Sequence, residues 1–195
     1  MDTAVTVMED MDMAVTVIAD MENMVIVMVP MDSLTNRALS MRERRQKMVD
    51  LHIHILPGID DGAKSLREAV EMARMSAESG VRAIAATSHG DFFLYESEEY
   101  LRIYQKKLEE FRRVLAEEQI PLKVYRGLEL MVNEGLFKAG KKGRLPGYGG
   151  GRSLLVEFYF DISRDRALKW TEELLSMGYR IVLAHPERYD FAQRR

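Results

Sequence analysis

Residues 48–62, MVDLHIHILPGIDDG, decide how this chain folds. Apolar and polar residues alternate from Val49 to Ile55, and this period of two is typical of a β-strand. Side chains two positions apart point to the same face of a strand, so that His52 and His54 project together. Two neighbouring imidazoles are natural ligands for one transition-metal ion, although two histidines on a solvated strand would give the same pattern.

A turn follows this strand at Pro57 and Gly58, and it carries Asp60 and Asp61. Acidic residues are common in turns for conformational reasons alone. Next to a pair of histidines, however, a carboxylate can also serve as a metal ligand. Of the two aspartates, we expect Asp61 to have this role.

The composition is that of a globular protein. The chain has 195 residues, of which 47% are hydrophobic and 30% charged, enough for one domain with a core. The net charge of −3 gives no reason to expect nucleic acid or an anionic membrane as a partner. The absence of cysteine excludes a disulfide framework, a cysteine-ligated zinc site and a thiolate nucleophile. It also agrees with a reducing cytoplasm, where we expect the protein to be located.

Residues 1–47 differ from the rest of the chain. They hold nine of the 14 methionines and repeat about every ten residues, so that each copy can supply at most one short strand. Acidic residues interrupt every apolar run, which argues against a signal peptide or a membrane-spanning segment. A strand-forming arm, a disordered extension and translated upstream DNA are all compatible with this leader. We favour the last, because Met48 directly precedes the first core strand.

Beyond the first strand, helices and strands alternate. A capping box at Ser65 begins one helix, which ends at Gly80, and Ser97 begins a second with Leu101 on its apolar face. The sequence predicts two further helices, at 133–139 and 166–177, and four further strands, at 81–87, 122–125, 154–160 and 181–184. It also predicts a flexible glycine-rich loop at 143–153. Five strands alternating with helices predict parallel βαβ units.

In barrels built from such units, the active site lies at the carboxyl ends of the strands. Every predicted strand brings a candidate metal ligand to or near that end: His52 and His54, His89, Glu129, Glu157 and His185. Imidazole and carboxylate ligands without thiolate suit manganese, iron or zinc, and this number of ligands suits more than one ion. The alternatives are a helix-start charge for Glu129 and an ion-paired buried carboxylate for Glu157.

Arg188 follows His185 by three residues in the sequence AHPERYD. A guanidinium at this position could bind two oxygens of a phosphate, which a metal site would hold at the same time. The alternative is a surface arginine paired with Glu187.

DLHIHILPGIDDG, ATSH, the Glu129 segment, LLVEF and AHPERYD, in this order, resemble the polymerase-and-histidinol-phosphatase (PHP) superfamily. More narrowly, they resemble its bacterial protein tyrosine phosphatases of capsular and exopolysaccharide synthesis. The resemblance implies a distorted TIM-like α/β barrel with up to three divalent ions, commonly manganese. It also implies hydrolysis of phosphotyrosine on a bacterial tyrosine kinase. By motif, Arg188 would bind phosphate, and the metal ligands would be His52, His54, Asp61, His89, Glu129, Glu157 and His185.

The chain departs from this family in length. The family continues past the His-Pro-Glu-Arg motif to an Asp-x-His pair, whereas residues 48–195 would form only the N-terminal portion of a barrel of ~250 residues. We therefore expect an incomplete barrel that binds metal weakly and turns over slowly, if at all. A phosphatase for a small-molecule phosphate and an inactive remnant remain alternatives. An amidohydrolase is less suitable, because it usually needs a lysine where this chain has Glu157.

Overall fold

The computed structural model describes residues 3–8, 13–20, 23–30, 48–90, 98–143 and 145–193. The chain divides into two units, Met1–Met48 and Val49–Arg195. In the first unit, an antiparallel sheet has the order β1-β2-β3; its strands are Thr3–Met8, Met13–Asp20 and Asn23–Pro30. Each copy of the ten-residue repeat thus supplies one short strand. That this leader is translated upstream DNA stays a prediction.

The second unit contains a five-stranded sheet with the order β4-β5-β6-β7-β8. The strands are Met48–Ile53, Val81–Gly90, Lys123–Met131, Ser153–Glu157 and Arg180–Leu183. The pairings β5–β6, β6–β7 and β7–β8 are parallel. The predicted fold class is confirmed: parallel strands alternate with helices and curl into an incomplete TIM-like barrel.

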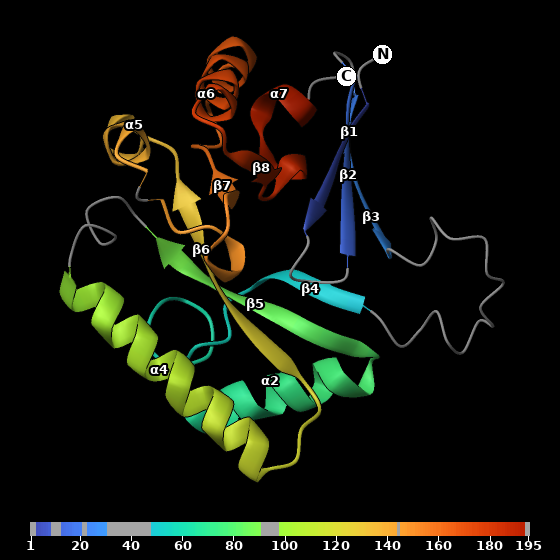
Figure 1. Ribbon diagram of the computed structural model, residues 1–195, viewed down its shortest axis with the longest axis vertical. Helices are drawn as coiled ribbons and strands as arrows, with labels where there is room; N and C mark the ends of the chain where they lie inside the picture. Colours follow the sequence, from blue (N-terminus) through green and yellow to red (C-terminus); the bar gives the residue numbers. More distant parts are fainter. Residues whose placement is uncertain are drawn as a thin grey trace, which may run out of the picture. The chain divides into compact units, whose positions relative to one another are not determined.

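Helices connect the strands of this sheet. They are α2 (Leu66–Glu78), α4 (Glu98–Glu117), α5 (Glu134–Lys141) and α6 (Arg164–Ser176), followed by the short α7 (Asp190–Gln193). Figure 1 shows α2 and α4 side by side, where they pack against β5 and β6 respectively. The predicted helix start at Ser65 is confirmed, because its hydroxyl accepts a hydrogen bond from the backbone N–H of Glu68. The carboxylate of Glu68 accepts from the backbone N–H of Lys64, so the second bond of the capping box goes to the neighbouring residue. On α4, the prediction for Leu101 was wrong: this residue is exposed, and the buried face begins at Tyr104.

The strands differ from the prediction at their carboxyl ends. The sequence predicted that Glu129 follows the third strand, but β6 continues through it to Met131. The parallel ladder explains this extension, since His89 on β5 and Leu155 on β7 are both register partners of Glu129. Glu129 therefore has strand neighbours on both sides, and its backbone is fixed in the middle of the sheet.

The glycine-rich loop was predicted to be flexible, and in the described part of it this prediction was wrong. Its 3₁₀ turn η2, Tyr148–Gly150, buries the ring of Tyr148. The hydroxyl of Tyr148 donates a hydrogen bond to the backbone oxygen of Leu51, at 2.9 Å. Gly127 leaves room for the ring, because a Cβ at this position would lie 3.3 Å from it. The loop thus ties β6 and β7 to the strand that carries His52.

Candidate metal centre

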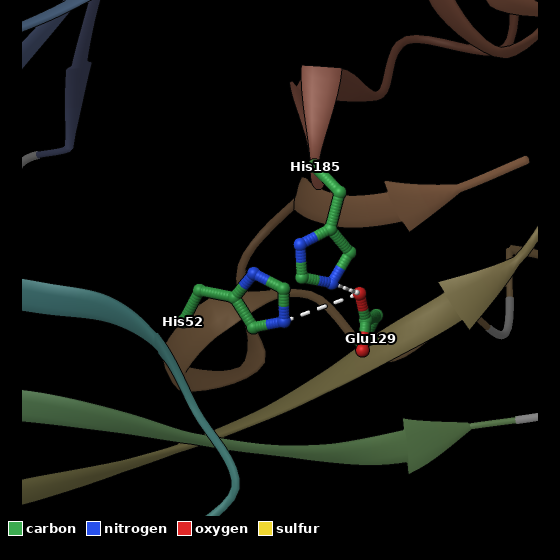
Figure 2. Close-up of side chains that lie close together, drawn as sticks. All are labelled: His52, Glu129 and His185. Atoms are coloured by element: carbon green, nitrogen blue, oxygen red, sulfur yellow. Dashed lines mark ion pairs between the residues drawn. The ribbon is translucent and has the colours of Figure 1, made fainter. Parts of the chain in front are cut away.

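The side chain of Glu129 lies at the centre of the candidate site, with an exposed fraction of 0%. Four imidazole nitrogens surround its two oxygens. Oε1 lies 3.1 Å from His52 Nε2 and 3.3 Å from His185 Nε2. Figure 2 marks both pairs with dashed lines. Oε2 lies 3.0 Å from His54 Nε2 and 3.2 Å from His89 Nδ1. All four histidines of the chain therefore meet at one carboxylate.

Four strands bring these side chains together at their carboxyl ends. His52 is the next-to-last residue of β4, and His54 lies just beyond the strand; their Nε2 atoms are 3.2 Å apart. His89 is beside Glu129 through the register of β5 and β6. His185 follows β8 and adopts the left-handed conformation, with φ 47° and ψ 47°, immediately before the 3₁₀ turn η3 (Pro186–Arg188). This conformation is uncommon for a residue other than glycine and is typical of functional sites.

The donor set fits divalent cations. Neither oxygen of Glu129 accepts a hydrogen bond of good geometry from the described residues, although both oxygens are buried. A buried carboxylate without hydrogen bonds is costly unless a cation balances it. Two ligands of one cation, with bonds of about 2.1 Å at angles of 90–109°, lie roughly 3.0–3.4 Å apart. The oxygen–nitrogen distances around Glu129 fall in this range.

Among the described residues, three groups of side chains have ligand atoms close enough for one ion: His52–Glu129–His185, His54–His89–Glu129 and His54–Asp60–Asp61. The first two groups share Glu129, so that one carboxylate could bridge two ions. The third group uses Nδ1 of His54, whereas the second uses Nε2. A neutral imidazole has only one lone pair for a metal, and its other nitrogen carries a proton. We therefore interpret the carboxylate beside Nδ1 as a partner of the His54 ring.

Asp60 has the better geometry for this task. Its side chain is only 5% exposed, and Oδ2 lies 3.2 Å from Nδ1 of His54. The backbone N–H groups of Gly62 and His89 also donate to its carboxylate, at 2.9 and 3.1 Å. Asp61, which the sequence favoured, is 79% exposed and lies 3.5 Å from His54 Nδ1 and 3.4 Å from His89 Nε2. A carboxylate that accepts the second ring proton of a ligating histidine fixes the orientation of that ring.

The charges of the site shift the pKa values of its members. Burial would raise the pKa of Glu129, but His52 and His54 outweigh it and lower this pKa to about 2. Burial also works against the charged form of His54, whereas Asp60 and Glu129 stabilise it and raise its pKa to about 10. The pKa of Asp60 falls to about 2 despite burial, because His54 and the backbone N–H of Gly62 stabilise the carboxylate. In the absence of metal, the site therefore holds a proton on His54.

The two remaining predicted site residues lie at the same end of the sheet. Glu157 ends β7 and is buried, and it is the register partner of Met131. Burial and the nearby charge of Glu129 raise its pKa. Its carboxylate belongs to none of the three ligand groups of the described residues. Arg188 is exposed in η3, and its guanidinium lies 5.6 Å above the ring of Phe160.

Parallel strands with imidazole and carboxylate groups at their carboxyl ends define an α/β-barrel protein with a candidate metal centre. The family model described as "Capsular polysaccharide synthesis, CpsB/CapC" matches residues 48–194. The chain belongs to this family. The family match thus begins where the leader ends.

Known relatives support this assignment. The chain is 34% identical over 141 residues to tyrosine-protein phosphatase YwqE of Bacillus subtilis, covering 72% of this chain and 55% of that protein. It is 31% identical over 146 residues to tyrosine-protein phosphatase CpsB of Streptococcus pneumoniae, covering 73% and 58%. A crystal structure from work on YwqE and CpsB, described as "unique metal-dependent tyrosine phosphatases", matches 73% of this chain and 57% of its own, with a TM-score of 0.63 and 34% identity. The chain spans about half the length of these relatives.

Among the described residues, no helix combines the length and the apolar character needed to cross a membrane.

Proposed function

We propose that this chain acts as a metal-dependent tyrosine phosphatase, which hydrolyses phosphotyrosine on a bacterial tyrosine kinase of capsule or exopolysaccharide synthesis. The observation that carries this proposal is the position of Glu129, a buried carboxylate within 3.3 Å of four imidazole nitrogens. The names of the relatives supply the substrate class, since both YwqE and CpsB are called tyrosine-protein phosphatases.

The proposed cofactor is manganese, with up to three ions, of which two would share Glu129. The residues proposed to hold them are His52, His54, His89, Glu129 and His185, with Asp61 as a further carboxylate ligand. Glu157, which is buried at the end of β7, is proposed as another carboxylate ligand. When bound, divalent cations lower the pKa of water and offset the negative charge of phosphoryl oxygens. Asp60 would hold the His54 ring with Nε2 facing Glu129, so that the ring keeps one orientation.

Arg188 is the proposed phosphate-binding residue. Its guanidinium presents several N–H donors in one plane, which match two oxygens of a phosphate monoester. Its charge reaches the site: it opposes the rise that burial causes in the pKa of Glu157, and it adds to the lowering that burial causes in the pKa of His185. Glu157 would remain anionic once cations offset the charge of neighbouring Glu129. We also propose that the protein is located in the cytoplasm, together with its kinase substrate.

Phosphate release from two peptides of the same sequence tests this proposal. One peptide carries phosphotyrosine and the other phosphoserine, and each is incubated with the full chain in Mn²⁺ or in EDTA. We expect slow release from the phosphotyrosine peptide that EDTA abolishes and that Arg188→Met reduces at least tenfold. The exposed Arg113→Met on α4 is the matched control and should leave the rate unchanged. A preference for phosphoserine, or a lack of metal-dependent release from phosphotyrosine, would overturn the proposal.

A further inference from the structure

Two large aromatic side chains are exposed next to the candidate site. Tyr159 and Phe160 follow the carboxyl end of β7, and they are 58% and 39% exposed. Only Phe158 separates them from Glu157, and its ring is buried. The strand thus delivers a buried carboxylate and then exposed aromatic surface to the same end of the sheet. Neighbouring exposed aromatic residues are typical of binding surfaces.

The conformation of this segment is fixed by its contacts with the chain after His185. The backbone N–H of Asp190 donates to the backbone oxygen of Phe160, at 3.0 Å. The buried ring of Tyr189 packs against the Phe160 ring, with centroids 5.8 Å apart and an angle of 59° between the planes. The Tyr189 hydroxyl donates to the backbone oxygen of Ala184 at 2.9 Å and accepts from the N–H of Phe158 at 3.1 Å. Phe160 is therefore held in place on a rigid support.

This aromatic surface adjoins the proposed phosphate-binding residue. The guanidinium carbon of Arg188 lies 5.6 Å from the centre of the Phe160 ring, a distance typical of a cation–π contact. The backbone N–H of Arg188 donates to the backbone oxygen of His185, at 2.9 Å. This turn holds the backbone of the arginine next to that of a candidate metal ligand. A phosphate bound between Arg188 and the metal centre would thus have Phe160 beside it.

We propose that Phe160, together with Tyr159, binds the aromatic ring of the phosphotyrosine substrate and determines specificity for it; this inference rests on the proposed function. Aromatic rings prefer offset or edge-to-face contacts with one another, which Phe160 can offer on its exposed part. A phosphoserine side chain has no ring to place there. The phosphate would then contribute affinity for any monoester, and Phe160 would favour the aryl ester.

Binding measurements separate these two contributions without requiring turnover. The full chain, loaded with Mn²⁺, is titrated calorimetrically with inorganic phosphate and with a peptide carrying phosphonomethyl-phenylalanine, a non-hydrolysable mimic of phosphotyrosine. We expect Phe160→Leu to weaken binding of the aryl peptide about tenfold, because the flat ring is lost while apolar bulk against Tyr189 remains. Its affinity for phosphate should stay within twofold. Leu168→Ala, which removes an exposed side chain on α6, is the control and should change neither affinity.

The outcomes distinguish this inference from the proposed function. If wild-type protein binds phosphate but gains nothing from the aryl group, the inference fails while the proposed function stands. If Phe160→Leu weakens phosphate and aryl peptide equally, Phe160 only supports Arg188, and the inference is also wrong. If Mn²⁺-loaded wild-type protein binds neither probe, the proposed function fails, and the inference fails with it.

Discussion

Replacing Glu129 by glutamine removes one negative charge from the candidate site and preserves the size of the side chain. Two effects oppose each other in the metal-free protein. The carboxylate oxygens are buried without hydrogen bonds from the described residues, which favours the neutral amide. The nearby His52 and His54 favour the charge, and their effect prevails, since the pKa of Glu129 falls from 4.5 to about 2.

The size of this preference follows from the pKa. One pKa unit corresponds to ~1.4 kcal/mol, so the charged form of Glu129 contributes about 3 kcal/mol to stability. The side chain has an exposed fraction of 0%, and solvent therefore screens this contribution little. The pKa of His54 moves further, to about 10, but Asp60 shares in that shift. Because the folded-state pKa of Glu129 is depressed, its contribution is present above pH 4.5 and is lost as the pH falls through about 2.

Urea denaturation in EDTA at pH 7 measures this effect. We expect Glu129→Gln to lower the free energy of unfolding by about 3 kcal/mol, and to lower Mn²⁺ affinity by at least ~100-fold because it removes an anionic ligand. The matched control is Glu71→Gln, the same chemical change at an exposed position of α2. A metal-free variant as stable as the parent would refute the reasoning, because the burial cost would then cancel the attraction of the imidazoles. Unchanged Mn²⁺ affinity would refute the role of Glu129 as a shared ligand.

Three further predictions concern the surroundings of Glu129. Asp60→Asn should weaken Mn²⁺ binding about 10–100-fold by calorimetry, because the Asp60 side chain beside His54 is only 5% exposed. Asp61→Asn should weaken it less, because the Asp61 side chain is 79% exposed, and the reverse order would show that Asp61 contributes more to the site than Asp60. Mn²⁺ must displace the proton of His54, whose pKa is about 10. The affinity of the protein for Mn²⁺ should therefore rise by up to ~10-fold per pH unit from pH 6.5 to 8.5, and an affinity that does not change with pH would contradict this. Tyr148→Phe should cost about 1–2 kcal/mol in urea denaturation, because it removes a hydrogen bond between a buried hydroxyl and the backbone oxygen of Leu51; no loss would show that the hydroxyl is dispensable.

Much of the fold could be predicted from local pattern. The alternation at His52 and His54 and the capping box at Ser65 are encoded within a few residues, and the structure contains the strand and the helix they predict. The extension of β6 through Glu129 could not be predicted in this way. It depends on ladder partners in β5 and β7, which lie tens of residues away in the sequence. The burial of Tyr148 likewise depends on the space at Gly127, which only the folded structure reveals.

The candidate site shows the same division between local and long-range information. The sequence indicated the residue types, because metal ligands form a small set of side chains and each followed a predicted strand. It could not choose between Asp60 and Asp61, which are adjacent in the same turn. The choice depends on which carboxylate faces the His54 ring and receives the N–H of His89, a contact across 29 residues. Tertiary structure, and not residue type, therefore separates the buried partner from the exposed one.

The central position of Glu129 has a consequence for stability as well as for chemistry. Its four imidazole neighbours come from the ends of β4, β5 and β8, so a cation held by two of them and Glu129 would link strands that are far apart in the sequence. A ligand that binds only the folded state stabilises it by an amount that grows with ligand concentration. For a sheet with β4 and β8 at its two edges, such a link would hold both edges to the central strand β6. The metal centre would then support the incomplete barrel that positions it.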